Sequence, residues 1–422
     1  MKPILVLLIF LTSLVGPAGA ADFYLRQGDR VVFYGDSITE QRLYTTITES
    51  YVVTRYPGLD VTFVHSGWSG DRVSGGGGGP IDLRLRRDVF VYKPTVLTIM
   101  LGMNDGEYKA ESEAVDRVFF DGYRQLVESV RHALPQIRIT AIRPSPYDEV
   151  TRPIDFTPGY NDVMVSFGKW IANYAAQANL NVADFNAPVV RMLEKANELD
   201  HETALKIIPD RVHPAQPGHL VMAEQLLKSW NARSTVASVN IAVTRGTPAV
   251  TCAAEHAMVT GLEAKDGLQW TELDDALPLP LMEWEEHGNG SLALALRSSD
   301  VAEALNNETL RVTGLKDGVY SLRIDGDAVG TFNNDRLATG INLGMLRTPM
   351  EKQAGKVWDL TVTHCNIHEN RWRSIQVPLS EYNLPQMAET MTAMDGLEAA
   401  VVAKQHEAAR PRAHHFSLSP VL

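Results

Sequence analysis

Two short motifs carry side chains that could perform nucleophilic chemistry together. The letters GDSIT at residues 35–39 offer the hydroxyl of Ser37, and DRVHP at residues 210–214 places Asp210 three residues before His213. At that spacing the carboxylate can hold the Nδ1–H of the imidazole, which leaves Nε2 free to take a proton from a serine. We therefore interpret Ser37 as a candidate nucleophile, His213 as its base and Asp210 as the residue that orients the base.

Two further motifs offer hydrogen-bond donors. SGWSGD covers residues 66–71, and GMND covers residues 102–105. The backbone N–H of Gly70 and the side-chain amide of Asn104 could join the N–H of Ser37 in holding a developing oxyanion. Taken singly, a motif of this kind is explained better by a turn or a helix cap than by catalysis. The three aspartates that adjoin the motifs, Asp36, Asp71 and Asp105, are interpreted as caps or loop anchors.

Apolar runs and amphipathic stretches alternate along the first half of the chain. Buried strands are predicted at residues 30–34, 61–65, 95–101, 138–142 and 181–183. Helices are predicted at residues 39–56, 113–133, 160–178, 189–198 and 217–230. Apolar strands that alternate with helices favour an α/β fold, here a doubly wound, flavodoxin-like five-stranded parallel sheet with helices on both faces. The carboxyl edge of such a sheet binds ligands, and the motifs would gather there.

In this order, the four motifs resemble the SGNH or GDSL hydrolase superfamily, which is named for its Ser, Gly, Asn and His. The resemblance covers roughly residues 28–232. It implies a carboxylic ester hydrolase with a catalytic triad of Ser37, His213 and Asp210. It also implies an oxyanion hole made by Ser37, Gly70 and Asn104, with no metal and no cofactor. His65 stands where many members have asparagine.

The resemblance is to exported bacterial members with a C-terminal extension. It implies an esterase that removes short acyl groups, chiefly acetyl, from a small molecule or a polysaccharide. A lipid acylhydrolase of the lysophospholipase or thioesterase type is one alternative, and a glycan-binding protein with a silent hydrolase domain is another. Trp68 either contacts the substrate or packs at the sheet edge. The glycine run at residues 75–79 is interpreted as a flexible loop near the site or as a plain connector.

Composition and charge limit the partners. The chain has 422 residues, enough for two or three domains, and its 39 basic and 51 acidic residues give a formal net charge of −12. This balance argues against nucleic acid or anionic lipid as the main partner, since both select a basic surface. No stretch of the mature chain is long and apolar enough to span a membrane. The oligomeric state stays open.

The N-terminus has the parts of a secretory signal peptide. Lys2 precedes an apolar run at residues 4–15, and a series of small residues ends at Ala20, after which we predict cleavage. The mature protein is therefore expected in the periplasm or outside the cell. We divide the chain into a signal peptide (1–20), a catalytic domain (21–233), a mostly β accessory domain (234–395), and a helix with a C-terminal tail (396–422).

The second half is expected to contain mainly β-structure. Strands are predicted at residues 236–250, 310–324, 357–363 and 373–377, with a hairpin turn at 314–318, another turn at 325–327, a helix at 395–405 and a loose tail. Cys252 and Cys365 are equally compatible with a disulfide or with two free thiols. His364, Cys365 and His368 are not expected to bind a metal, because residues four apart share a face only on a regular strand.

Overall fold

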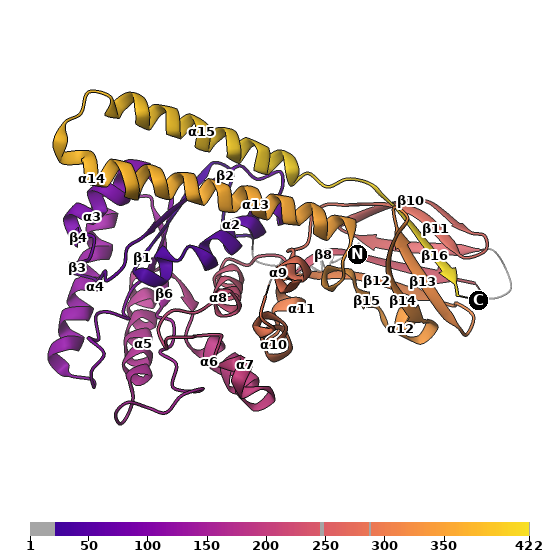
Figure 1. The fold of residues 1–422 in the computed structure, drawn as a ribbon, viewed down its shortest axis with the longest axis horizontal. Helices are drawn as coiled ribbons and strands as arrows, with labels where there is room; N and C mark the ends of the chain where they lie inside the picture. Colours follow the sequence, from indigo (N-terminus) through magenta and orange to yellow (C-terminus); the bar gives the residue numbers. More distant parts are fainter. Residues whose placement is uncertain (1–21, 245–248, 287, 422) are drawn as a thin grey trace, which may run out of the picture.

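The computed structural model describes residues 22–244, 249–286 and 288–421 and shows two regions with long helices running between them (Figure 1). An α/β region lies at one end of the molecule, and two β-sheets lie at the other. Among these residues, no helix combines the length and the apolar character that crossing a bilayer requires. The predicted signal peptide and its cleavage site at Ala20 lie outside the described residues.

The α/β region is built on a parallel sheet with the spatial order β2-β1-β5-β6-β7. Its strands are β1 (Asp29–Gly35), β2 (Val61–Gly67), β5 (Val96–Met100), β6 (Arg138–Arg143) and β7 (Asn181–Asp184). Each coincides with a predicted strand, because runs such as Val31 to Tyr34 are apolar on both faces and fully buried. The order reverses beside β1, so the predicted doubly wound fold class is confirmed.

Helices cover this sheet. The longer ones are α2 (Leu43–Arg55), α3 (Ile81–Asp88), α4 (Glu113–Ala133), α5 (Tyr160–Ala178), α6 (Ala187–Leu199) and α8 (Gln216–Ser229). α2 packs beside α8, and α4 packs beside α5, as right-handed crossovers between parallel strands require. α4 shows the local reason, since the hydroxyl of Ser112 caps its first turn and its buried residues recur at helical spacing.

The helix predicted at residues 39–56 is interrupted. α1 (Ser37–Glu40) ends after one turn, and Arg42 adopts a left-handed φ of 60° before α2 begins. Such a φ is uncommon outside glycine. Here Nη1 of Arg42 donates to the carbonyl of Cys365 and to the side chain of Asn366, at 3.2 Å each. The field at Ser37 therefore comes from local N–H groups rather than from a long helix dipole.

Two sheets form the second region. One has the order β10-β11-β16-β13-β14, and the other has the order β15-β12-β8-β9. Their strands are β8 (Thr235–Val243), β9 (Val250–Glu255), β10 (Ala257–Ala264), β11 (Leu268–Asp274), β12 (Asn307–Thr313), β13 (Val319–Ile324), β14 (Asp327–Asn333), β15 (Ile341–Asn342) and β16 (His414–Pro420). Side chains from both sheets share a second apolar core that includes Trp270, Leu310, Leu322 and Phe416. The expected β-rich second region is confirmed.

The two turns predicted in this region have different outcomes. Residues 314–318 connect β12 to β13, which lie in different sheets, so the predicted hairpin at this place is wrong. Asp325 and Gly326 do form a hairpin turn between the antiparallel strands β13 and β14, with φ values of 51° and 87°. Positive φ at both central residues matches the right-handed twist of paired strands, which explains why this turn closes a hairpin.

The strands predicted at residues 357–363 and 373–377 are wrong. The first segment lies in α13 (Pro349–Glu369), and the second begins in the π-helix η3 (Asn370–Gln376) that continues α13. The segment at 357–363 is rich in residues that favour strands, but its buried positions recur at helical spacing. The start of α13 carries a capping signal, since the hydroxyl of Thr348 accepts the N–H of Glu351 at 3.1 Å.

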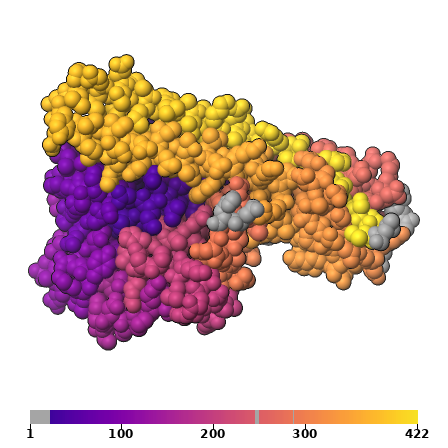
Figure 2. Space-filling model, in the orientation of Figure 1, coloured from indigo at the N-terminus to yellow at the C-terminus, as the bar shows by residue number. Residues whose placement is uncertain are grey.

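A helical arm, which we define as residues 349–408, lies across α2 and β2 of the α/β region (Figure 1, Figure 2). It contains α13, η3, α14 (Val377–Leu379) and α15 (Met387–Ala408), and α15 runs back along α13. α15 includes the helix predicted at 395–405. The tail beyond it is not loose, because β16 pairs with β11 on one side and with β13 on the other.

The two cysteines are free thiols in separate places. Cys252 is exposed on β9, and Cys365 is buried on α13. Cys365 contacts the α/β region instead, with its Sγ 3.3 Å from the hydroxyl oxygen of Thr46. The disulfide alternative is therefore excluded in this fold.

Three buried carboxyl groups lie together near the junction of the two regions. Glu272, Asp274 and Glu308 are each at most 7% exposed. Burial raises the pKa of all three, that of Glu308 to about 8, and repulsion between carboxylates adds to the shift for Asp274 and Glu308. The buried guanidinium of Arg55 opposes the shift of Glu308 but does not cancel it. The fold therefore favours their neutral acid forms.

We expect the free energy of unfolding to fall as the pH rises from about 5 to about 8. Glu308 keeps its proton in the folded protein up to about pH 8 but loses it near its ordinary pKa of 4.5 when unfolded, so ionisation favours the unfolded state over that interval. In Glu308→Gln this decline should be smaller by about 3.5 kcal/mol, measured by urea titration across the interval. The exposed control Glu255→Gln should follow the wild type, and an unchanged pH slope in Glu308→Gln would contradict the assignment.

Candidate active site

The four motifs meet at the carboxyl edge of the parallel sheet, as their order along the chain predicted. Ser37 follows β1 and opens α1, the loop at 68–71 follows β2, and Asn104 follows β5. His213 lies on the turn that precedes α8. The end of β2 comes so close to α1 that a Cβ on Gly67 would lie 2.1 Å from the backbone nitrogen of Glu40. Only a residue without a side chain permits this approach.

Ser37, His213 and Asp210 form a continuous chain of hydrogen bonds. Nε2 of His213 lies 2.8 Å from Oγ of Ser37, and Nδ1 of His213 lies 2.7 Å from Oδ2 of Asp210. Both separations are short enough for proton transfer between the serine and the imidazole. The side chain of His213 is 34% exposed and that of Asp210 is 55% exposed. A substrate can therefore reach this chain from solvent.

The local sequence holds His213 in place. Oδ1 of Asp210 accepts the backbone N–H groups of Val212 and His213 at 3.0 and 2.7 Å, and Arg211 takes a left-handed φ of 72°. Aspartate commonly forms such turns through its own side chain. Burial acts to raise the pKa of Asp210, but the hydrogen bonds from His213 outweigh it and hold that pKa below its ordinary value. Asp210 is thus an anion at neutral pH and faces Nδ1 of His213.

Asn104 is oriented by two hydrogen bonds. Its Nδ2 donates to the carbonyl of Asp71 at 3.1 Å, and its Oδ1 accepts the hydroxyl of Tyr108 at 3.3 Å. A third bond joins the same two loops, because Oδ1 of Asp105 accepts the N–H of Val73 at 2.9 Å. The loops that carry the two predicted oxyanion donors are therefore cross-linked to each other.

The glycine run at residues 75–79 forms a small hairpin. β3 (Gly75–Gly76) pairs antiparallel with β4 (Gly79–Pro80). A Cβ on Gly76 would lie 2.2 Å from the carbonyl oxygen of Gly70, so the hairpin packs directly on the backbone of the loop after β2. Gly70 itself has a φ of 75°, a conformation that favours glycine. The run thus supports the backbone of a predicted oxyanion donor.

Arg84, which the sequence analysis did not single out, supports the same loop. Its side chain is fully buried, with Nε 2.6 Å from Oδ2 of Asp71 and Nη1 bonded to Asp88. Nη2 donates to the carbonyl of Ser66 at 2.8 Å. A buried guanidinium between two carboxylates fixes their geometry, because losing one partner leaves uncompensated charge. Arg84 lies in a helix rich in charged residues, a pattern that in sequence is typical of a solvated surface.

The helical arm reaches the site through Trp68. Cζ of Arg373 lies 3.5 Å from the centroid of the Trp68 ring. The same guanidinium forms an ion pair with Glu40, with Nη2 3.0 Å from Oε1. Trp372 packs edge-on against Trp68, and its Nε1 donates to Oδ1 of Asp88 at 2.6 Å. Trp68 is half-buried and has an arginine over its ring, so its contact with substrate stays a prediction. No motif marks Arg373 in the sequence.

The aspartates that adjoin the motifs orient the backbone, as predicted. Oδ1 of Asp36 accepts the N–H of Ile38 at 3.0 Å, and Oδ1 of Asp71 accepts the N–H of Gly78 at 2.9 Å. Burial raises the pKa of Asp36 to about 8 and that of Asp105 to about 7. At neutral pH the neutral form of Asp36 therefore predominates, which keeps one negative charge away from the place where an oxyanion would form.

Half-buried Gln41 and buried His219 form a pair behind His213 that no sequence motif indicates. Nε2 of Gln41 donates to the carbonyl of Pro214 at 3.2 Å, and Oε1 of Gln41 lies 3.0 Å from Nε2 of His219. Burial lowers the pKa of His219 to about 3, so this imidazole is neutral, and its Nδ1 accepts the N–H of Tyr44 at 3.2 Å. The pair connects the bend between α1 and α2 to the turn that carries His213.

The chain is similar to several known proteins. Residues 33–221 match the GDSL-like lipase/acylhydrolase family. An acetylxylan esterase from Geobacillus stearothermophilus is 25% identical over 219 residues, which cover 48% of this chain and 93% of that protein. The crystal structure of Axe2, an acetylxylan esterase from the same organism, is 23% identical with a TM-score of 0.40 and covers 50% of this chain and 99% of that one.

One solved structure matches nearly the whole chain. It is a gut microbial diltiazem-metabolizing enzyme, which is 25% identical with a TM-score of 0.77 and covers 94% of this chain and 98% of that one. The similarity therefore extends through the second region and the helical arm. The family match covers all four motifs, and the observed sheet order is the one that the sequence predicted. Residues 33–221 form a domain of the SGNH/GDSL hydrolase superfamily, and the protein is a carboxylic ester hydrolase.

Proposed function

We propose that Ser37 is the nucleophile of this esterase, that His213 is its general base, and that Asp210 orients His213. The observation that carries the proposal is the hydrogen-bonded chain from Oγ of Ser37 through both nitrogens of His213 to Asp210, with separations of 2.8 and 2.7 Å. An intact chain of this kind favours an active enzyme over a glycan-binding protein with a silent hydrolase domain.

The reaction follows from this arrangement. Nε2 of His213 takes the proton of Ser37 as Oγ bonds to the ester carbonyl carbon, and the carbonyl oxygen receives the electron pair as an oxyanion. When the carbonyl re-forms, the bond to the alcohol breaks, and His213 gives its proton to the leaving oxygen. Water then attacks the acyl group on Ser37 in the same way, which releases the acid and restores the enzyme. Asp210 stays ionised throughout and stabilises the imidazolium.

We further propose that the oxyanion is held by the N–H of Ser37, the N–H of Gly70 and the amide of Asn104. The carbonyl of Asp71 uses one amide proton of Asn104, which leaves the second for a substrate. The cross-linked loops and the buried Arg84 support the proposal, because donors that are already oriented need no reorganisation when charge develops.

The substrate that we propose is a short acyl ester, chiefly an acetyl group on a carbohydrate. The similarity to an acetylxylan esterase supports this choice, although that match covers only 48% of the chain. The chain is also similar over nearly its full length to a diltiazem-metabolizing enzyme, so diltiazem is a second compound to test. We also propose that the mature protein is exported after cleavage near Ala20, on the strength of the N-terminal sequence pattern.

Replacing the nucleophile should abolish catalysis. In Ser37→Ala the hydrolysis of p-nitrophenyl acetate should fall on the order of 10⁶-fold, to the background rate. The matched control is Ser69→Ala, since Ser69 is an exposed serine in the loop after β2 and should keep wild-type kcat/KM. Substantial activity in Ser37→Ala, in protein shown by circular dichroism to be folded, would refute the nucleophile assignment.

Removing the side-chain oxyanion donor should slow the chemical step. Asn104→Ala should lower kcat by about 10²–10³-fold, equivalent to about 2.7–4 kcal/mol of barrier, with little change in KM. The exposed Asn240 on β8 provides the control Asn240→Ala. Steady-state kinetics on p-nitrophenyl acetate distinguish the roles, because an effect confined to KM would place Asn104 in ground-state binding instead.

A series of esters tests the proposed substrate. We expect kcat/KM to decrease from p-nitrophenyl acetate through butyrate to octanoate, and we expect acetate release from acetylated xylan and from diltiazem. A preference for octanoate would favour the lipid acylhydrolase instead. Release of acetate from diltiazem but not from acetylated xylan would restrict the substrate to small molecules. Ser37→Ala serves as the blank in each assay.

A further inference from the structure

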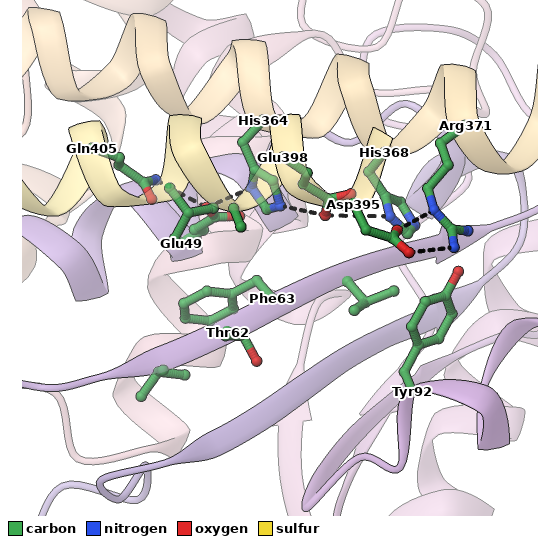
Figure 3. A pocket seen from close by; sticks show the side chains of 14 residues that line it. Glu49, Thr62, Phe63, Tyr92, His364, His368, Arg371, Asp395, Glu398 and Gln405 are labelled. Atoms are coloured by element: carbon green, nitrogen blue, oxygen red, sulfur yellow. Dashed lines mark hydrogen bonds and ion pairs between the residues drawn. The ribbon is translucent and has the colours of Figure 1, made fainter. Parts of the chain in front are cut away.

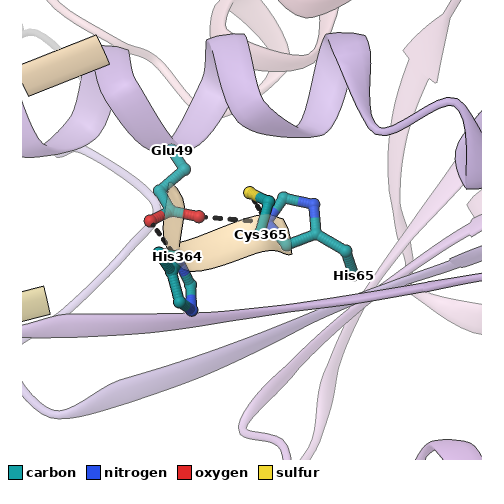
Figure 4. Close-up of side chains that lie close together, drawn as sticks. All are labelled: Glu49, His65, His364 and Cys365. Carbon is teal, nitrogen blue, oxygen red and sulfur yellow. Dashed lines mark hydrogen bonds and ion pairs between the residues drawn. The ribbon is translucent and has the colours of Figure 1, made fainter. Parts of the chain in front are cut away.

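Four residues of the kinds that bind metal ions converge where the helical arm meets the α/β region (Figure 4). Glu49 comes from α2, His65 from β2, and His364 and Cys365 from α13. Each residue is at most 3% exposed. One ligand atom from each lies within 4.8 Å of the ligand atoms of the other three. The esterase mechanism proposed for Ser37 uses none of these residues.

The four donor atoms face one another at short range. Nε2 of His65 lies 3.0 Å from Oε2 of Glu49 and 3.2 Å from Sγ of Cys365. Nδ1 of His364 lies 2.9 Å from Oε1 of Glu49. In a tetrahedral zinc site, bonds of about 2.0–2.3 Å separate neighbouring ligand atoms by about 3.3–3.6 Å. Small side-chain adjustments would therefore place all four donors around one ion.

The outer contacts are those that metal-bound histidines make. Nε2 of His364 lies 3.0 Å from Oε1 of Glu398, and Nδ1 of His65 lies 2.7 Å from Oγ1 of Thr45. A ligating histidine ordinarily presents its second nitrogen to a carboxylate or another acceptor, which fixes its tautomer and orientation. The carboxylate is placed by α15, which lies along α13 (Figure 3).

We propose that Glu49, His65, His364 and Cys365 bind one Zn²⁺ ion as a structural site. Thiolate and imidazole ligands together favour zinc over magnesium or calcium, which prefer oxygen ligands. Ionised Glu49 and Cys365 balance the two positive charges, and such balance matters because an isolated charge is costly in a buried place. Four protein ligands leave no open coordination position, so the ion has a structural and not a catalytic role.

This proposal replaces the sequence-based expectation that His364, Cys365 and His368 bind no metal. That expectation rested on a strand, whereas the segment is helical and two of its residues meet partners from α2 and β2. His368 is not a ligand in this arrangement, because its Nδ1 lies near Glu398, at 3.6 Å. A cavity of about 330 Å³, whose lining includes Glu49, His364, His368 and Glu398, adjoins the cluster (Figure 3).

Zinc at this place would connect distant parts of the chain. His65 and Cys365 are 300 residues apart in sequence. Crosslinking them would fix α13 against α2 and β2, close along the chain to Trp372 and Arg373, which contact Trp68 beside the active site. The expected result of metal binding is therefore a more stable attachment of the helical arm.

Metal content and thermal stability of the full mature protein provide the first test. After equilibration with Zn²⁺ and removal of unbound ion, we expect one zinc per chain by elemental mass spectrometry and a melting temperature that a chelator lowers. Cys365→Ser should lose the zinc, whereas Cys252→Ser, which removes the exposed cysteine, should retain it. Ser37→Ala should also retain it, so that the outcome is independent of the proposed esterase mechanism.

Cobalt provides a spectroscopic readout of the ligands. Protein loaded with Co²⁺ should show a thiolate-to-cobalt charge-transfer band and the strong visible bands of tetrahedral cobalt, and Cys365→Ser should remove the charge-transfer band. Glu398→Gln alters only an outer carboxylate and should weaken zinc affinity by about 10–100-fold, which keeps the test decisive if Cys365→Ser does not fold. Absence of bound zinc in the wild type, or a cobalt spectrum without a thiolate band, would overturn the proposal and leave a buried network of ion pairs.

Discussion

Parallel strands end at a shared edge, and the chemistry of this protein depends on that constraint. β1, β2 and β5 are neighbours in the sheet, so the loops that follow them are brought within reach of one another. Two of these strands end in a glycine that the packing requires. A Cβ on Gly35 or on Gly67 would lie 2.1 Å from an atom of Thr39 or Glu40. This close approach places the start of α1, which carries Ser37, against the end of β2. His213 reaches Ser37 from the turn before α8.

Buried charge holds the loops at this edge in position. Arg84 is enclosed by Asp71 and Asp88, and the indole N–H of Trp372 adds a bond from the helical arm to Asp88. Each partner is needed, because a charge left alone in the interior costs several kcal/mol. By contrast, burial keeps Asp36 mainly as a neutral acid at neutral pH, so the region next to Ser37 carries less negative charge. The same physical effect, desolvation, therefore serves both rigidity and electrostatics at the site.

The helical arm connects the two regions, because it packs against the α/β region and continues into a strand of the second region. α13 lies against α2 and β2, where the Glu49 cluster forms, and its continuation η3 brings Arg373 to Trp68 and Glu40. The chain then returns along α15 and ends as β16 in the middle of the antiparallel sheet. The last strand of the second region thus follows the arm in the chain. The solved structure that matches 94% of this chain is long enough to include the arm and both sheets.

Local sequence patterns were enough to predict the parallel sheet, the doubly wound order of its strands and the four motifs at its edge. Apolar runs and helical stripes are local properties, so all five strands of the α/β sheet and the helices at 113–133 and 160–178 could be predicted. Tertiary structure alone decided the rest. Helical packing overrode the strand propensity of residues 357–363, and the partners of Arg84, Arg373 and Cys365 come from elements far away in the chain. A buried charge or thiol is defined by what surrounds it, and those surroundings exist only once the chain has folded.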